Sequence, residues 1–249
     1  MGSNKMKTIN AEGLYYRQLN EQIDKVVKTD KNIILNNVFG QRYIGRALPE
    51  KVKIKINGFP GNDMAAYMDG AELEVFGNGQ DAVGNTMNGG RIIVHGNCGD
   101  TTGYAMRGGE IYVEGYVGYR VGIHMKEYKE IKPVIVIGKK AGDFLGEYMA
   151  GGAIIVLGVG LDKNEDLIGK YCGTGIHGGA IFLNGSPDKY KLGKEAAKTE
   201  LTDADKALLK KHIEAYGKYF KKDVSKIKAE KFSKYAPLSA NPYSKMYSK

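Results

Sequence analysis

The sequence contains no tryptophan, six prolines and only two cysteines among 249 residues. Cys98 and Cys172 form no C-x-x-C pair, and no apolar signal-like segment stands at the N-terminus, so we expect a reducing, cytoplasmic location. No apolar run approaches the about 20 residues needed to span a bilayer, so we expect no membrane partner.

Glycine, in contrast, is abundant, with 35 residues, and a repeat accounts for the excess. Strand-like segments recur, and each is followed five residues later by a glycine. They begin at Lys53, Glu72, Arg91, Glu110, Pro133, Ala153 and Ala180, and their glycines are Gly58, Gly77, Gly96, Gly115, Gly138, Gly158 and Gly185. The first four starts are 19 residues apart, a period typical of stacked repeats. Because apolar residues alternate within the unit, we predict an all-β solenoid, a single-stranded parallel β-helix of about seven coils.

Three apolar columns are predicted to fill the core of this solenoid. One contains Ile54, Leu73, Ile92, Ile111, Val134, Ile154 and Ile181, and the second contains Ile56, Val75, Val94, Val113, Val136, Val156 and Leu183. The third follows the glycine corner and contains Met68, Met87, Met106, Met125, Met149 and Ile176. No histidine or cysteine shares the methionine column, so we interpret it as core packing rather than a metal path.

The outward positions change character along the stack. Lys53, Glu72, Arg91 and Glu110 alternate in sign, as do Lys55 and Glu74, so stacked coils are expected to form ion pairs that fix the register. Later outward positions are predicted to be apolar, namely Ile135, Ile137, Ile155, Leu157 and Phe182. We expect this flank to be covered by a partner, by a second copy of the chain in a homo-oligomer, or by the C-terminal helix.

Glycines mark the corners of the predicted coils. They are Gly77, Gly84, Gly96, Gly99, Gly103, Gly115, Gly118, Gly122, Gly138, Gly142, Gly146, Gly158, Gly169 and Gly173. We expect a positive φ at these corners, which glycine adopts without steric cost. Gly173, Gly175 and Gly178 also spell G-x-G-x-x-G, but a strand pattern follows instead of a helix, which argues against a nucleotide site.

Three regions follow from these patterns. Residues 1–31 are predicted to form an N-terminal helical cap, residues 32–190 the β-helix, and residues 191–249 a C-terminal helix with an extended basic tail. A strand over residues 32–38 is predicted to follow the cap helix and to complete the cap of the first coil. Thr202 is a suitable N-cap for the C-terminal helix. Residues 191–249 contain 15 lysines and 7 acidic residues, whereas the rest of the chain is nearly neutral. We interpret the tail as a strap laid over the solenoid; the alternative from a different class is a single-stranded nucleic-acid-binding module.

No set of residues suggests catalysis. His95, His124 and His177 occupy three different positions of the repeat, so stacking does not gather them into a metal or acid–base site. Cys98 and Cys172 are interpreted as small buried thiols. We therefore expect no catalytic residue, metal or cofactor in this chain.

Three glycine-rich phrases carry a family likeness. They are Gly99-Asp-Thr-Thr-Gly-Tyr-Ala-Met-Arg-Gly-Gly109, Gly118-Tyr-Arg-Val-Gly-Ile-His-Met-Lys126 and Gly142-Asp-Phe-Leu-Gly-Glu-Tyr-Met-Ala-Gly-Gly152. Over roughly Asn32 to Gly185 the chain resembles the C-terminal G-x-G-x-G domain of the glutamate synthase large subunit. It carries neither the amidotransferase domain with its cysteine nucleophile nor the flavin-binding barrel, so it resembles the stand-alone form of that domain.

The resemblance implies a scaffold subunit that braces a glutamine amidotransferase and a synthase component in glutamate biosynthesis and ammonia assimilation. It also implies that FMN and an iron–sulfur cluster are bound by those partner subunits. Equivalent β-helical subunits of N-methylglutamate synthase or formylmethanofuran dehydrogenase remain alternatives. Polar residues near the corners are candidates for partner contact, and they are Arg42, Tyr43, Arg120, His124, Lys126 and His177.

Overall fold

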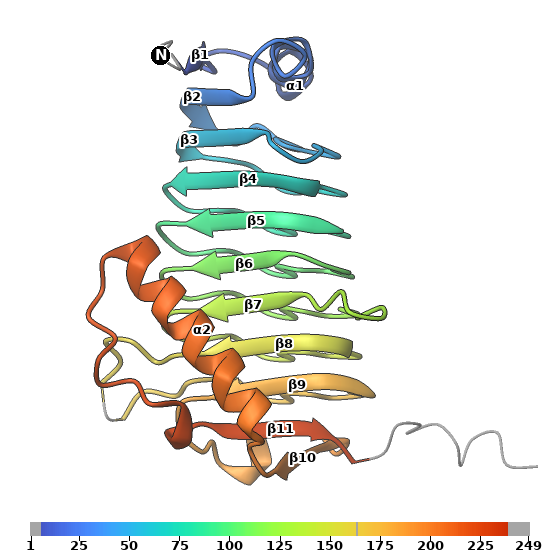
Figure 1. Cartoon of the computed structure of the whole chain (residues 1–249), viewed down its shortest axis with the longest axis vertical. Coiled ribbons are helices and arrows are strands. Elements are labelled where there is room, and N and C mark those ends of the chain that lie inside the picture. The colour runs from blue at the N-terminus through green and yellow to red at the C-terminus, as the bar shows by residue number, and fades with distance from the viewer. Residues whose placement is uncertain (1–5, 163, 239–249) are drawn as a thin grey trace, which may run out of the picture.

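The computed structural model describes residues 6–162 and 164–238, which form one solenoid with a single continuous sheet (Figure 1). The elements are β1 (Lys7–Asn10), α1 (Tyr16–Val26), β2 (Asn32–Phe39), β3 (Lys53–Phe59), β4 (Asp69–Phe76), β5 (Gly89–Val94), β6 (Glu110–Val113), β7 (Val134–Ile137), β8 (Ala150–Val156), β9 (Gly178–Leu183), η1 (Lys189–Lys191), β10 (Ala196–Thr199), α2 (Asp203–Phe220), η2 (Ala229–Lys231) and β11 (Ser233–Pro237). Strands β1 to β9 stack in chain order and in parallel, and β11 and β10 close the last coil in antiparallel pairing. The seven predicted strands are β3 to β9, which bound six complete turns.

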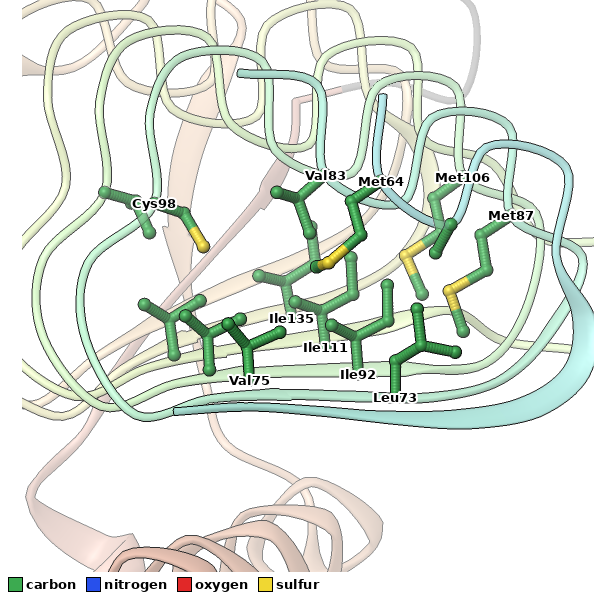
Figure 2. Packing of buried hydrophobic residues seen from close by; sticks show 14 of the residues in the cluster. Met64, Leu73, Val75, Val83, Met87, Ile92, Cys98, Met106, Ile111 and Ile135 are labelled. Atoms are coloured by element: carbon green, nitrogen blue, oxygen red, sulfur yellow. The ribbon is translucent and has the colours of Figure 1, made fainter. Parts of the chain in front are cut away.

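Each coil returns behind the sheet through a segment in which three alternate residues adopt left-handed backbone angles. In one coil these residues are Arg120, Gly122 and His124, with φ of 54°, 71° and 55°. Equivalent triplets lie within residues 43–47, 63–67, 82–86, 101–105, 144–148 and 171–175. We call the surface formed by these seven segments the rear face. Figure 2 shows the core side chains held between the strands and these segments, with Met64, Val83, Met87 and Met106 opposite Leu73, Ile92 and Ile111.

The predicted core columns are confirmed except in β7. There Ile111 pairs with Ile135 and Val113 with Ile137, so Ile135 and Ile137 point inward and Val134 and Val136 point outward. The predicted register was wrong by one residue because the strand was started at Pro133. The first position of these strands donates an N–H to the previous coil, as Val134 does to the Gly109 carbonyl at 3.0 Å, and proline has no N–H to donate.

The alternating charges form the expected ion-pair ladder. Lys53 Nζ lies 3.4 Å from Glu72 Oε1, and Glu72 Oε2 lies 3.3 Å from Arg91 Nη1. Arg91 Nη2 continues the ladder to Glu110 Oε2 at 2.9 Å. These side chains are partly exposed, so each pair contributes about 0.5 kcal/mol at most and serves mainly to hold the register.

The apolar flank of the later coils is covered by α2 of the same chain. The buried outer cluster joins Val134, Val136, Ile155, Leu157 and Phe182 of the sheet to Leu209, Ile213, Tyr216 and Phe220 of α2. Figure 1 shows α2 lying diagonally across the lower strands. Of the three covers considered, the structure uses the C-terminal helix, so this flank is not available to a second copy of the chain.

The segment after α2 folds back on the solenoid, as the strap interpretation predicts. Through η2 it reaches β11, which pairs antiparallel with β9 and with β10. The N-terminal cap contains the predicted helix, α1, and the predicted strand over residues 32–38 corresponds to β2. The structure adds β1, which was not predicted and which pairs in parallel with β2. The last part of the predicted tail, residues 239–249, lies outside the described residues.

The corner glycines divide into two classes, and the positive-φ explanation holds for only one. Six have positive φ, namely Gly84, Gly103, Gly122, Gly146, Gly158 and Gly173. The other eight must be glycine because the neighbouring coil lies too close to leave room for a Cβ. They are Gly77, Gly96, Gly99, Gly115, Gly118, Gly138, Gly142 and Gly169. At Gly99 an added Cβ would overlap Asp81 Oδ1, because that oxygen accepts a 2.9 Å hydrogen bond from the Asp100 N–H.

We expect Gly99→Ala to destabilise the protein by about 1–3 kcal/mol, because the added methyl group meets Asp81 Oδ1. Asp81→Ala alone loses the hydrogen bond to Asp100 N–H, at a cost of about 1 kcal/mol. The double variant should lose less than the sum, because removing the oxygen relieves the overlap. Denaturant unfolding of the four proteins measures this coupling, and strictly additive losses would contradict the close-approach explanation.

A buried histidine fastens α2 to the sheet. His212 Nδ1 lies 2.7 Å from the hydroxyl of Tyr112 on β6, and that hydroxyl lies 3.4 Å from Glu110 Oε2. Burial is the main cause that lowers the pKa of His212 to about 4, and the nearby Lys211 and Arg91 lower it further against the opposing effect of Glu110. The folded protein therefore favours the neutral imidazole.

An ordinary histidine pKa of about 6.5 applies to the unfolded chain, so the unfolded state binds the proton first as the pH falls. The contribution of His212 is complete above about pH 6.5 and is lost between about pH 6.5 and 4. We expect a loss on the order of 2–3 kcal/mol over this range, and a smaller loss in His212→Gln. Equal pH dependence of the unfolding free energy in the two proteins would show that His212 does not control it.

Candidate protein-interaction surface

The six predicted contact residues fall in three places. Arg120 and His124 lie in the same rear-face segment, and Lys126 follows them directly. His177 lies two coils further along, at the position equivalent to Lys126. The Lys126 N–H donates to the Met106 carbonyl, and the His177 N–H donates in the same way to the Met149 carbonyl. Tyr43 begins the first rear-face segment and Arg42 directly precedes it, both beside α1, where the Tyr43 ring lies 5.8 Å from the Tyr16 ring. The structure therefore groups only part of the predicted set.

Arg120 is held between a buried carboxylate and an aromatic ring. Its Nε donates a 2.9 Å hydrogen bond to Glu147 Oε2, and its guanidinium lies 4.9 Å from the centre of the Phe144 ring. Phe144 stacks in turn on Tyr171 of the next coil, with the centroids 4.9 Å apart. The Glu147 side chain is only 10% exposed, so the ion pair fixes the orientation of the arginine on this face.

A second row of rings runs beside the first. Tyr104 meets His124 edge to face at 6.1 Å, and His124 stacks on Tyr148 at 5.4 Å. The Tyr148 ring lies directly over Gly175, where an added Cβ would overlap the ring. The left-handed segments bring equivalent residues of successive coils into register about 4.8 Å apart. Phe144 and Tyr171 are equivalent in this way, as are His124 and Tyr148, whereas Tyr104 stands one position before the equivalent residue of its own coil.

Together these rows form a surface that we call the aromatic patch, made of Tyr104, Arg120, His124, Phe144, Tyr148 and Tyr171. Its outer rings remain accessible, since Tyr104, Tyr148 and Tyr171 are 39%, 38% and 50% exposed. Tyrosine and arginine are enriched at protein interfaces, where they give large contact areas from few mobile groups. The arrangement is therefore suited to binding another protein.

Three exposed cations flank the residues of the aromatic patch along the chain. Arg107, Lys126 and Lys170 are exposed and make no ion pair with any residue that the structure describes. The neighbouring Asp143 is engaged, because its Oδ1 accepts a 2.8 Å hydrogen bond from the Lys170 N–H. A partner that carries carboxylates would complement this surface.

Neither metal chemistry nor thiol chemistry is favoured at this surface. Within residues 6–162 and 164–238, no group of three histidine, cysteine, aspartate or glutamate side chains could hold a metal ion. Cys98 and Cys172 are buried, and this burial raises the pKa of each thiol to about 12. Thiols with such a pKa are poor nucleophiles near neutral pH.

Sequence reasoning found Arg120 and His124 but missed the residues that complete the patch. Phe144 and Tyr148 stand 24 residues beyond Arg120 and His124, and Tyr171 stands 27 residues beyond Phe144. The loop insertions break the 19-residue period at these points and hide the shared columns. The phrases Gly118-Tyr-Arg-Val-Gly and Gly142-Asp-Phe-Leu-Gly do align these positions, and they were the signal that could have revealed them.

Comparison with known families agrees with this architecture. The model of the GXGXG motif family matches residues 16–241, which is most of the chain. The chain belongs to this family, the family of the C-terminal domain of the glutamate synthase large subunit.

A curated relative matches this chain over almost the whole length of both proteins. Uncharacterized protein MJ1350 of Methanocaldococcus jannaschii is 51% identical, over 96% of this chain and 95% of the relative. Among the described residues of this GXGXG protein, no helix has the length and apolar character needed to cross a membrane.

We expect Arg120→Ala to lower the unfolding free energy by about 1 kcal/mol or more, because it leaves the buried carboxylate of Glu147 without its partner. Adding Glu147→Gln should restore part of that loss. Lys126→Ala serves as the matched control and should stay within about 0.5 kcal/mol of the parent protein, because its side chain is exposed and unpaired. Equal stability of Arg120→Ala and Lys126→Ala would contradict a structural role for the ion pair.

Proposed function

We propose that this chain is a non-catalytic scaffold subunit of a glutamate synthase-like complex in ammonia assimilation. It would brace a glutamine amidotransferase chain and an FMN- and iron–sulfur-containing synthase chain. Membership of the GXGXG family supports the choice of complex. The observation that carries the scaffold role is the aromatic patch, an exposed and internally ordered set of rings and arginine on a stiff solenoid.

The energetics of the patch favour protein binding over a solvated surface. Its side chains are already ordered by stacking and by the Arg120–Glu147 ion pair, so little conformational entropy remains to be lost on association. Binding would cover the exposed tyrosines and bring acidic groups of the partner to Lys126 and Lys170. Such an interface gains affinity from the rings and association rate from the charges.

The same scaffold chemistry would serve a complex that uses methylamine to form N-methylglutamate. It would also serve a formylmethanofuran dehydrogenase-like complex, because each needs a rigid β-helical subunit whose partners hold the cofactors. The glycine phrases that include Arg120 and His124 favour the glutamate synthase-like assembly. Partner identity therefore provides the most direct test.

Purified chain should form a stoichiometric complex with the amidotransferase-like and FMN-binding chains of the same organism, measured by size-exclusion chromatography with light scattering. Combining Tyr148→Ser with Lys126→Glu should weaken capture of at least one chain by about tenfold or more, because it removes one ring and reverses one charge. Lys218→Glu on the exposed face of α2 is the matched control. Failure of the unaltered chain to bind either protein would contradict the proposed function.

A further inference from the structure

A hollow with a volume of about 1050 Å³ lies at the capped end of the solenoid, away from the aromatic patch. It is lined by the loop before α1 and by the carboxyl ends of β2 and β3. We call it the cap hollow. Figure 1 shows these elements at the opposite end of the stack from α2 and β11.

The walls of the cap hollow are held in place by Gln41, which is only 8% exposed. Its Nε2 donates hydrogen bonds to the carbonyls of Ala11 and Leu14, at 3.0 and 3.1 Å. Its Oε1 accepts a 2.6 Å hydrogen bond from the Phe39 N–H. The loop before α1 is thereby tied to the end of β2, so the hollow exists before any ligand arrives.

Large aromatic side chains stand exposed around this hollow. Phe39 is 81% exposed, Tyr15 is 60% exposed and Phe59 is 45% exposed. Phe39 and Phe59 occupy paired positions on β2 and β3, so their rings form one apolar rim. An apolar rim of this kind beside a hollow marks a binding surface for a protein.

The remaining lining is amide-rich and almost without charge. Asn57 Nδ2 donates to Asn36 Oδ1 at 2.7 Å, and Asn37 Nδ2 donates to Asn10 Oδ1 at 2.9 Å. These bonds leave Asn57 Oδ1 and the second hydrogens of the amide groups without a partner among the described residues. Among the residues that the structure describes, Glu12 is the one charged residue that lines the hollow. Free amide donors and acceptors match the N–H and C=O groups of an extended peptide. An anionic ligand would find no counter-charge in this lining, and the exposed carboxylate of Glu12 is the single charge that it offers to a cationic one.

We propose that the cap hollow docks an extended, uncharged segment of one partner polypeptide, with an apolar side chain placed against Phe39 and Phe59. This inference rests on the proposed scaffold function and adds a second docking surface to it. The aromatic patch is flanked by the unpaired cations Arg107, Lys126 and Lys170, whereas the lining of the cap hollow carries only the charge of Glu12 among the described residues. Two surfaces of such different chemistry, on different parts of the solenoid, bind two different chains.

Biolayer interferometry with the purified amidotransferase-like chain and, separately, the purified FMN-binding chain tests this assignment. The double variant Tyr15→Ser/Phe39→Ser should bind one of the two chains at least about tenfold more weakly and leave the other unchanged. The affected affinity should vary little between about 0.05 and 0.5 M salt, because no charge pair forms in the hollow. Tyr148→Ser in the aromatic patch should weaken the binding of the other chain.

Tyr190→Ser is the control, since Tyr190 is 65% exposed and does not line the hollow. Thermal unfolding should show that every variant remains folded at the temperature of the binding measurement. If the unaltered protein binds a partner and Tyr15→Ser/Phe39→Ser binds both chains with unaltered affinity, the cap hollow is not a docking surface and the scaffold function stands. If Tyr148→Ser and Tyr15→Ser/Phe39→Ser both weaken the binding of the same chain, the two-surface assignment is overturned. Binding of neither chain by the unaltered protein overturns the scaffold function and this inference together.

Discussion

The whole structure depends on the close approach of one coil to the next at the corners. There a side-chain oxygen of one coil accepts a hydrogen bond from a backbone N–H of the following coil, as Asn97 Oδ1 does from the Tyr116 N–H at 3.0 Å. The oxygen occupies the space that a Cβ at Gly115 would need. Each contact thus satisfies a backbone donor that would otherwise be unpaired and fixes the register of two coils. Glycine is the residue that leaves room for it.

This constraint makes the two faces of the solenoid unequal. The strand face presents flat rows of side chains, which are charged and self-paired in the early coils and apolar in the later ones, where α2 buries them. The rear face is built from left-handed segments whose inward positions are core residues and whose outward positions are free of packing demands. Rings and charges can accumulate on the rear face without cost to the fold. The rear face can therefore carry exposed rings and cations, and the aromatic patch lies there.

The sequence predicted the architecture well because the solenoid repeats a local rule. The glycine spacing and the alternating columns were sufficient to place β3 to β9, the methionine column and the charge ladder. The error at β7 arose because spacing alone could not weigh the missing N–H of Pro133. The contact residues were harder to predict, because ring stacking between Phe144 and Tyr171 joins residues across an insertion whose length the period does not encode.

The geometry of a solenoid also bears on how a scaffold works. Successive coils are separated by about 4.8 Å along the axis, so the distance between two docking surfaces is set by the number of coils between them. Insertions such as residues 126–132 extend outward from a coil and leave that spacing unchanged, as the unbroken pairing from β6 through β7 to β8 shows. The cap hollow at β2 and β3 and the aromatic patch between β5 and β9 are thus held at a fixed separation. This fixed separation would suit the proposed scaffold function, because it would hold two bound partner chains at a constant distance from one another.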